Sequence, residues 1–513
     1  MHTLELVLLL VAASLALTLA ANRLEVPSAV MLVLGGMVLA FLPGLPAVNL
    51  NPELALALFL PPLLQASALR TDWGAFRANI VFIVLLAFGA VLFTAAAVAA
   101  TARLLIPDLG WPAAIALGAI VAPPDAIAAA SVLKRFRLPK RVVAVLEGES
   151  LVNDASALVL YKVAVAAALA GAFRVDGLAA SVALPAVIGV AAGLAAGAAA
   201  NWLMLHLKDR FLEIVTSFLA AFFSYFVAEW TGGSGVLAAV ACGGLIGRAQ
   251  IKLAARTRLE TNSAWELVEF VLASLVFLLV GLQLRGILSR LTDHAPGQLA
   301  LLGAAVAATL IVSRFVWVFL TFYPASALTA AIRGEGFSPP LSYPTIISWA
   351  GMRGVVSLAA ALALPAGFPG RDLIVFLGFC AIFSTLVLQG TTLKLLIGWF
   401  DLHDPEIEAV TPATAAAREM VAAAIAGVMP GDTLASRQPL RDFLAAQARA
   451  ATDADRARLA SHLDARLRAL HVAREELKER RSDIDGETLA TLTEALDLEE
   501  RQLRLATDGA EAV

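Results

Sequence analysis

Long apolar runs separated by short polar stretches follow one another from the N-terminus to about residue 400. A run of about 20 apolar residues is long enough to cross a bilayer as a helix. Hydropathy predicts thirteen spans, at residues 4–21, 26–43, 52–69, 79–101, 111–133, 142–172, 177–205, 211–229, 234–250, 264–284, 298–322, 341–364 and 372–400. The pattern therefore predicts an all-α polytopic membrane protein.

Two of the predicted spans are broken near their middles. Ala122-Pro123-Pro124-Asp125 interrupts the fifth span, because consecutive prolines lack the backbone donors that a continuous helix needs. Gly351-Met352-Arg353-Gly354 interrupts the twelfth. If spans 1–6 and 8–13 are two halves, each break falls in the fifth span of its half. This layout predicts two inverted six-helix repeats whose discontinuous helices cross at the midplane of the membrane.

Charge divides the chain into two regions. The first 400 residues hold 24 Lys/Arg and 19 Asp/Glu, whereas the residues from Asp401 onward hold 14 and 22. The sequence therefore predicts a transmembrane domain at 1–400 and a helical tail at 401–513, with a regulatory or dimer-supporting role. The predicted loops on one side carry fifteen Lys/Arg against five on the other. The positive-inside rule then puts the N-terminus outside and the tail in the cytoplasm, as expected for a multi-pass inner-membrane protein.

Other chemistry has little support in the sequence. The two cysteines, Cys242 and Cys380, lie in apolar runs and show no metal-ligand spacing. No phosphate loop or nucleotide fingerprint occurs, so we expect no cofactor, no nucleic-acid partner and no enzymatic activity. The first run begins after Met1-His2-Thr3 without a basic region, which favours a retained first helix over a signal peptide.

Carboxylates within the sixth span indicate an ion or proton site. Asp154 lies 12 residues in from Val142, roughly 18 Å along a helix and near the middle of the hydrocarbon layer. An aspartate at that depth costs on the order of 3 kcal/mol to insert. Polarity gathers on adjoining helix faces, with Glu147, Ser150 and Asp154 at i, i+3, i+7 and Glu149 and Asn153 at i, i+4.

Asp154 and Asp125 are the first candidates for binding the transported ions. Desolvation favours the neutral form of a buried carboxylate, which can then hold either a proton or a cation such as Na⁺. That competition is sufficient for exchange. Asn153 is expected to hold the broken strand or a neighbouring carboxylate in place, and Ser150 either offers a hydroxyl oxygen or bonds back to its own helix.

Two arginines lie in apolar spans and need acidic partners. Arg353 lies 12 residues into its span, at a depth that matches Asp154. Glu149 is the first choice of partner and Glu147 the second, in a pair that would brace the two repeats. Arg314 is interpreted as structural.

Three other functions remain as alternatives to cation/proton antiport. A Na⁺-coupled symporter of the same architecture would need a cavity for an organic substrate. A cation channel predicts a continuous polar stripe, whereas the polar residues here gather at one depth. An intramembrane aspartyl protease would use Asp125 and Asp154 as an acid/base pair, but it leaves Arg353 and the paired breaks unexplained.

Several segments across the membrane domain carry recognisable motifs. They are Phe59-Leu60-Pro61-Pro62-Leu63-Leu64, the Pro-Pro-Asp stretch at 123–125, Gly148-Glu149-Ser150-Leu151-Val152-Asn153-Asp154, Ala228-Glu229, Ser234-Gly235-Val236-Leu237-Ala238, Leu275-Val276-Phe277-Leu278-Leu279-Val280-Gly281-Leu282 and Gly351-Met352-Arg353-Gly354. With these segments the chain resembles the monovalent cation:proton antiporter family, specifically the bacterial branch of the sodium/proton exchanger group.

The resemblance implies a homodimer in the membrane lipid, with a core domain that moves against a dimerisation domain. It implies that Asp154 binds Na⁺ or H⁺ with Asp125, Ser150 and Asn153 around it, and that Glu149 and Arg353 pair. The asparagine before Asp154 implies electroneutral exchange. Two departures leave the choice among Na⁺, Li⁺ and K⁺ open: Pro124 replaces a family threonine, and Ala66 occupies a position that is acidic or amide in many relatives, for which Gln65 is a substitute in another register.

Overall fold

The computed structural model describes most of the chain up to residue 400. The described residues are 3–43, 52–71, 73–125, 128–129, 139–170, 178–207, 209–250, 253, 255–291, 295–333, 340–365, 367–400, 466–468, 500 and 503. Within these ranges the chain forms helices and turns and no strand, so the all-α prediction is confirmed. The predicted tail at 401–513 lies almost entirely outside the described residues. By compactness the chain divides into Met1–Leu402 and His403–Val513.

Helical segments occur in every predicted span, although most of the second half of the fifth span, after residue 125, lies outside the described residues. The segments are α1 (Thr3–Arg23), α2 (Ser28–Ala40), α3 (Pro52–Arg70), α4 (Trp73–Ala78), α5 (Ile80–Val84), η1 (Leu85–Ala90), α6 (Val91–Leu105), α7 (Trp111–Val121), α9 (Lys140–Ala170), α10 (Leu178–Leu207), α11 (Arg210–Trp230), α12 (Gly235–Ala249), α13 (Ala255–Leu288), α14 (Pro296–Arg333), α15 (Ser342–Trp349), α16 (Val355–Leu362), α17 (Arg371–Ser384), η3 (Thr385–Gln389) and α18 (Gly390–Phe400). Eight of the described helical stretches are long and apolar enough to cross a membrane by themselves. The number of crossings and the inverted repeats stay predictions.

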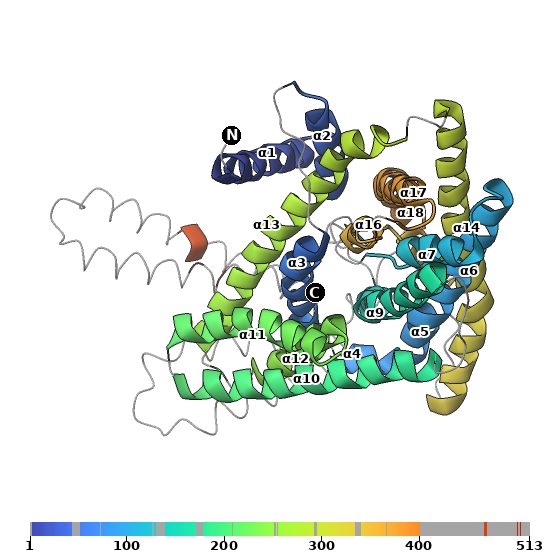
Figure 1. Cartoon of the computed structure of the whole chain (residues 1–513). Coiled ribbons are helices and arrows are strands. Elements are labelled where there is room, and N and C mark those ends of the chain that lie inside the picture. The colour runs from blue at the N-terminus through green and yellow to red at the C-terminus, as the bar shows by residue number, and fades with distance from the viewer. Residues whose placement is uncertain are drawn as a thin grey trace, which may run out of the picture. The chain divides into compact units, whose positions relative to one another are not determined.

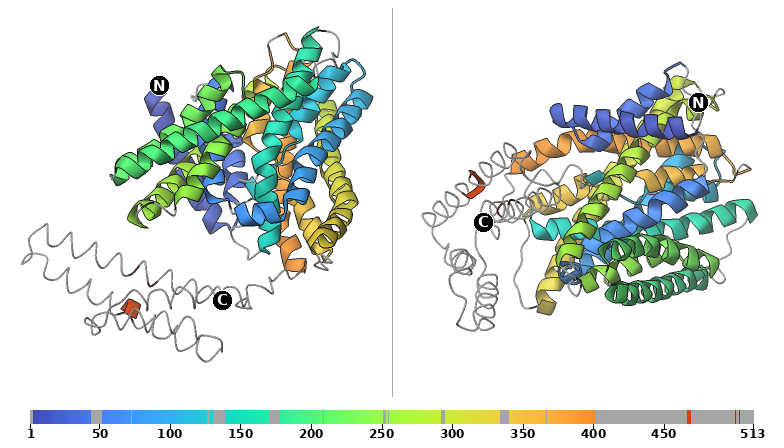
Figure 2. Two further views of the ribbon diagram at one scale, coloured as in Figure 1. Left: turned by 90° about the horizontal axis from the view of Figure 1, so that it is seen from below. Right: turned by 90° about the vertical axis from the view of Figure 1, so that its left-hand side faces the viewer.

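The helices of residues 1–400 form two groups that lie side by side (Figures 1 and 2). We call α1–α3 and α10–α13 the scaffold helices, since α13 packs on α2 and α12 packs on both α3 and α10. The other group, the core helices, comprises α5–α7, α9 and α14–α18, in which α7 packs on α6 and α9 and α14 packs on α6 and α17. The two groups meet where α3 and α13 face α9 and α16.

Both predicted breaks lie among the core helices and contact each other. Helix α7 ends at Val121, and residues 122–125 are not helical. Helix α15 ends at Trp349 and α16 begins at Val355, with a non-helical stretch at 351–354 between them. The backbone N–H of Asp125 donates to the carbonyl of Met352 at 2.8 Å. The breaks predicted from the prolines and the paired glycines are therefore present, joined by a backbone hydrogen bond.

Close approach of α2 and α13 fixes the position of one wall of the site. A Cβ on Gly36 would collide with the carbonyl of Leu278, and a Cβ on Gly281 would collide with the carbonyl of Val33. Glycine at both positions therefore lets the two backbones touch, which is how membrane helices gain packing without a hydrophobic driving force. This contact holds α13, whose middle lines the pocket described below.

Candidate ion-binding site

A pocket between the scaffold helices and the core helices contains the carboxylate of Asp154. Its empty volume is about 590 Å³, and its walls come from α3, α9, α13, α16 and the first break. The lining residues are Phe59, Leu60, Leu63, Leu64, Ser67, Asp125, Ser150, Leu151, Asp154, Ala273, Phe277 and Val356. Most of them are apolar, so the few polar oxygens concentrate at the α9 side, where Ser150 and Asp154 lie one helical turn apart.

Asp154 is buried and has no oppositely charged partner among the described residues. Its side chain is 7% exposed, and within the part of the chain that the structure describes it makes no ion pair or hydrogen bond. Asp125, half-buried in the first break, lies close enough to Asp154 for their charges to interact. Two carboxylates in one pocket repel each other when both are ionised, which favours binding of a proton or a cation between them.

Gly354 makes room for Asp125 at the crossing. A Cβ on Gly354 would overlap the Oδ2 and Cγ atoms of Asp125, so the carboxylate packs against the bare Cα of the second break. The hydrogen bond from the Asp125 N–H to the Met352 carbonyl also joins the two breaks at this contact. The two breaks therefore position Asp125 jointly, with one supplying the carboxylate and the other its space.

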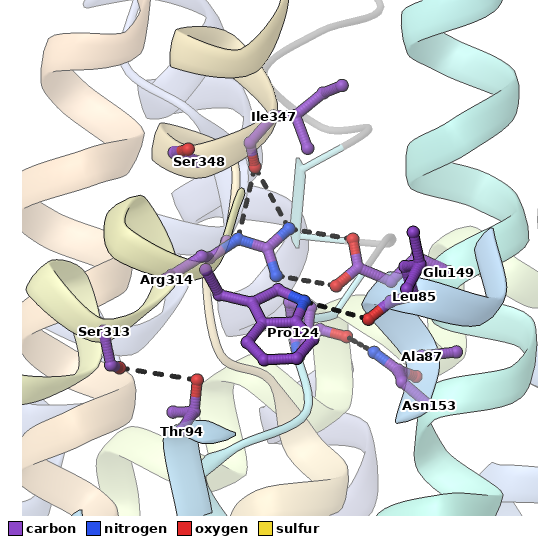
Figure 3. A network of polar contacts seen from close by, with 12 residues as sticks. Leu85, Ala87, Thr94, Pro124, Glu149, Asn153, Ser313, Arg314, Ile347 and Ser348 are labelled. Carbon is purple, nitrogen blue, oxygen red and sulfur yellow. Dashed lines mark hydrogen bonds and ion pairs between the residues drawn. The ribbon is translucent and has the colours of Figure 1, made fainter. Parts of the chain in front are cut away.

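Asn153 connects α9 to the first break. Its Nδ2 donates to the carbonyl of Pro124 at 2.8 Å, and its side chain is fully buried (Figure 3). Its Oδ1 has no hydrogen-bond partner among the described residues. One hydrogen bond thus fixes the amide plane and leaves the amide oxygen buried without a partner among the described residues. This is the position expected of a residue that holds the broken strand.

The ion pair of Glu149 corrects the prediction made from the sequence. Arg314 of α14, and not Arg353, forms the pair: its Nη1 and Nη2 donate to Oε1 and Oε2 of Glu149 at 2.6 and 2.8 Å (Figure 3). The Nε and Nη2 of Arg314 also donate to the carbonyl of Ile347, at 3.2 and 3.0 Å. The planar guanidinium therefore satisfies both carboxylate oxygens and a carbonyl at once, at a site where both side chains are buried.

Arg353 has other partners, which explains why the predicted pair does not form. Its Nε donates to the carbonyl of Val121 at 2.7 Å, and its Nη1 donates to the carbonyl of Gly351. Val121 is the last residue of α7, and Gly351 follows the end of α15. Free carbonyls at a helix C-terminus carry partial negative charge. The buried guanidinium of Arg353 is therefore hydrogen-bonded by the two half-helices themselves and braces the crossing.

Two secondary candidates lie outside the pocket. Glu147 is half-buried on α9 and does not line the pocket. Gln65 is fully buried on the other face of α3, where its Nε2 donates to the carbonyl of Ser217 of α11 at 2.6 Å. Ala66 also faces the scaffold, in an apolar cluster with α11 and α12. Neither Gln65 nor Ala66 therefore stands where it would contact Asn153.

Sequence reasoning missed the residues that fasten the core helices around the site. The backbone N–H of Arg353 donates to Thr385 Oγ1 at 3.1 Å, at the start of the π-helical segment η3. In the other π-helical segment, η1, the carbonyls of Leu85 and Ala87 accept from Trp317 Nε1 and Ser156 Oγ. A π-turn frees carbonyls from the helical ladder. The spacing of apolar residues carries no signal for such a turn.

Taken together, the geometry suits reversible binding of a hard monovalent cation or a proton. The other charged groups at this depth, Glu149, Arg314 and Arg353, are held by one another or by backbone carbonyls. Asp154, with Asp125 in the same pocket, has no fixed countercharge among the described residues. Carboxylate and hydroxyl oxygens, such as those of Asp154 and Ser150 in the pocket, are ligands that alkali cations accept.

Discontinuous helices that cross beside an unpaired buried carboxylate define a secondary transporter of ions. The chain belongs to the sodium/hydrogen exchanger (transmembrane) family, whose model matches residues 9–399. The resemblance stated from the motifs is thereby confirmed.

Relatives and solved structures agree with this assignment. The chain is 34% identical to the "Uncharacterized Na(+)/H(+) exchanger Rv2287" of Mycobacterium tuberculosis, over 76% of this chain and 73% of that one. It is 33% identical to the sodium, potassium, lithium and rubidium/H(+) antiporter of Bacillus pumilus, over 71% and 56%. The sodium proton antiporter MjNhaP1 of Methanocaldococcus jannaschii shares its fold, with a TM-score of 0.60, 19% identity and coverage of 75% of this chain and 98% of the other.

Proposed function

We propose that this protein exchanges Na⁺ for H⁺ across the membrane, with both ions competing for Asp154. One observation carries the proposal: Asp154 is 7% exposed, lines the pocket between the two groups of helices, and has no countercharge among the described residues. An ionised carboxylate cannot stay in that environment at low cost without a bound cation or proton. The site is therefore occupied by one or the other.

Competition for Asp154 produces exchange if the site can switch from one side of the membrane to the other only while Na⁺ or H⁺ is bound. Binding of Na⁺ or H⁺ neutralises Asp154, and the core helices then carry it past the scaffold helices to the other side of the membrane. The empty, charged site would be held back by the cost of moving an uncompensated carboxylate through an apolar interface. Each transition then carries one ion in one direction, which makes the exchange electroneutral.

Na⁺ is the proposed cation, with Li⁺ and K⁺ as further substrates to be compared. The Bacillus pumilus relative is named as an antiporter of potassium, lithium and rubidium as well as sodium, so the family fold is compatible with several alkali cations. In this chain the first break presents the buried carbonyl of Pro124 to Asn153, where a threonine would add a hydroxyl. Fewer oxygens beside Asp125 would weaken discrimination by size.

The proposed setting is the inner membrane, with the N-terminus outside and the tail in the cytoplasm. We further propose a homodimer in which the scaffold helices form the contact, because their outer face exposes large apolar side chains that include Phe211, Leu219, Phe223 and Trp230 of α11. The transported ions are the proposed ligands of the Asp154 pocket, and we expect exchange to need no cofactor.

Proteoliposomes with an imposed pH gradient and an internal pH dye test the proposal. We expect Na⁺ to dissipate the gradient with the native chain and to have no effect with Asp154→Asn. Asp372→Asn, which changes an exposed carboxylate at the start of α17, is the matched control and is expected to exchange normally. A voltage-sensitive dye should register no Na⁺-driven potential. Exchange by Asp154→Asn would refute the assignment, and an ion-driven potential would refute electroneutrality.

A further inference from the structure

A second group of buried oxygens lies among the scaffold helices, on the far side of α3 from Asp154. Two hydrogen bonds bring three helices together there. Gln65 Nε2 of α3 donates to the carbonyl of Ser217 of α11 at 2.6 Å, and Trp265 Nε1 of α13 donates to Ser217 Oγ at 3.1 Å. Ser217, Gln65 and Trp265 are all buried.

The pairing of α11 with α13 puts Glu213 and Thr261 in the adjoining layer. Arg210 Nη1 of α11 bonds to Glu260 Oε1 of α13 at 2.9 Å, and Ser217 bonds to Trp265 further along both helices. The two helices therefore run in the same direction at this contact. Glu213 is four residues before Ser217 and Thr261 is four residues before Trp265, one helical turn in each case. Glu213 and Thr261 thus fill the layer between the two contacts.

Three oxygens in this group have no hydrogen-bond partner among the described residues. They are Gln65 Oε1, Glu213 Oε2 and Thr261 Oγ1, on side chains that are 0%, 7% and 0% exposed. The bond from Gln65 Nε2 to a carbonyl fixes which end of the amide is the oxygen. Buried polar groups are ordinarily satisfied, so three unsatisfied oxygens at, or one helical turn from, the Gln65–Ser217–Trp265 contact call for a ligand.

Charge identifies the ligand. Arg210, the cation nearest in sequence to Glu213, pairs with Glu260, and Arg70 of α3 pairs with Glu269 of α13. No ion pair of Glu213 occurs in the described part of the chain. We propose that Glu213, Gln65 and Thr261 bind a monovalent cation, Na⁺ or K⁺. One carboxylate and two neutral oxygens balance a single positive charge, and hard oxygen ligands select an alkali cation. A divalent ion would remain under-neutralised and under-coordinated.

This site would regulate exchange and take no part in carrying the ion. The proposed orientation puts the start of α11, and with it Glu213, on the cytoplasmic side. Helices α3 and α13 contribute to both sites: Leu64 and Ser67 flank Gln65 and line the Asp154 pocket, as does Ala273 of α13. A cation held by Gln65 and Thr261 would tie α3 to α13 and bias the wall that faces Asp154. Linkage then requires each site to change the affinity of the other.

Cation binding to the full-length protein in nanodiscs tests the inference without any transport. In an Asp154→Asn chain, thermal unfolding is followed as NaCl or KCl replaces choline chloride at constant ionic strength. A ligand that binds only the folded state raises the melting temperature progressively as its concentration exceeds its dissociation constant. We expect such a rise with Asp154→Asn, and none when Glu213→Gln is added. Glu229→Gln, at the opposite end of α11, is the matched control and should keep the rise.

Thr261→Val keeps the test decisive if Glu213→Gln does not fold. It removes one oxygen without changing charge, and loss of one ligand should raise the half-saturating cation concentration about tenfold. The inference is overturned if the Asp154→Asn chain shows no difference between Na⁺ or K⁺ and choline, which would mean that the oxygens hold water only. It is also overturned if the stabilisation survives Glu213→Gln. Because the readout is binding in a chain without Asp154, these outcomes are independent of whether Asp154 carries the exchange.

Discussion

Two classes of buried charge lie five residues apart on α9. Glu149 is neutralised by Arg314 through two hydrogen bonds, whereas Asp154 faces a pocket and has no fixed partner in the described structure. A charge that is paired and fully hydrogen-bonded gains nothing from binding an ion, and one that is unpaired gains a great deal. The difference in partner, and not in depth, therefore separates the bracing carboxylate from the binding one.

The Glu149–Arg314 pair should contribute to stability as a unit. Arg314→Met leaves Glu149 buried without a countercharge and is expected to destabilise the protein by about 3 to 5 kcal/mol. Glu149→Gln together with Arg314→Met removes both charges and should recover much of that loss. The melting temperatures of the two single variants and the double variant, measured in one detergent, give the coupling energy. A second double-mutant cycle, on Glu149 and Arg353, is the control, because the guanidinium of Arg353 bonds to Val121 and Gly351. An equal or larger coupling of Glu149 with Arg353 would contradict the structure.

Sequence reasoning located the buried charges but could not assign the pairs. Depth along a span places Asp154, Glu149 and Arg353 near the middle of the predicted membrane, since helical rise is constant, and the structure buries all three side chains. Depth carries no information about which way a side chain points, and Arg353 lies in a non-helical stretch where helical periodicity does not apply. Arg314 reaches Glu149 because α14 packs on other core helices, among them α6 and α15. The same limit explains Gln65, which faces α11 and not the pocket.

The two helix breaks form a single hydrogen-bonded unit among the core helices. The prolines end α7 and the glycines separate α15 from α16, and both signals could be read directly from the sequence. What the sequence could not show is that the breaks hydrogen-bond through Asp125 and Met352, or that Arg353 caps α7 by bonding to Val121. Those contacts link residues about 230 positions apart and depend on the crossing angle of the helices.

Gly354→Ala should impair exchange without preventing folding. The added methyl group would occupy the position of the Asp125 carboxylate, so either Asp125 or the second break must move. Overpacking of this kind costs about 1 to 3 kcal/mol, equivalent to roughly tenfold in the affinity of a site that depends on Asp125. The half-saturating Na⁺ concentration for exchange in proteoliposomes measures the effect.

Gly378→Ala in α17 is the matched control for that substitution. Its new methyl group would meet Ala361 and Ile120 at ordinary contact distances of 3.5 and 3.7 Å. We expect its exchange to match that of the native chain. Normal Na⁺ affinity in Gly354→Ala, with native protein levels in the membrane, would mean that Asp125 does not depend on the second break for its position.

For the molecule as a whole, the pocket lies on the boundary between two groups of helices and not inside either one. Leu60, Leu64 and Ala68 of α3 pack against Leu151 and Ala155 of α9 in one apolar cluster along this boundary. Apolar side chains can slide past one another without breaking hydrogen bonds. By contrast, the core helices are joined internally by the Glu149–Arg314 pair and by the bond between the two breaks. The boundary is therefore the place where relative movement costs least.

Cross-linking α3 to α9 should stop exchange if the core helices move against the scaffold. Leu64 and Leu151 belong to the boundary cluster and both line the pocket. In a chain lacking Cys242 and Cys380, the pair Leu64→Cys and Leu151→Cys is oxidised in proteoliposomes, and exchange is compared before oxidation, after it, and after reduction. We expect loss on oxidation and recovery on reduction, because a disulfide restrains the two Cα atoms to within about 7 Å. The control is Gly303→Cys in a chain that lacks Cys242 but keeps Cys380, because this pair lies between α14 and α17 within the core helices. Its oxidation should leave exchange intact. If the α3–α9 disulfide forms fully and exchange continues, the two groups do not need to move apart, and alternating access must arise from smaller changes within the core helices themselves.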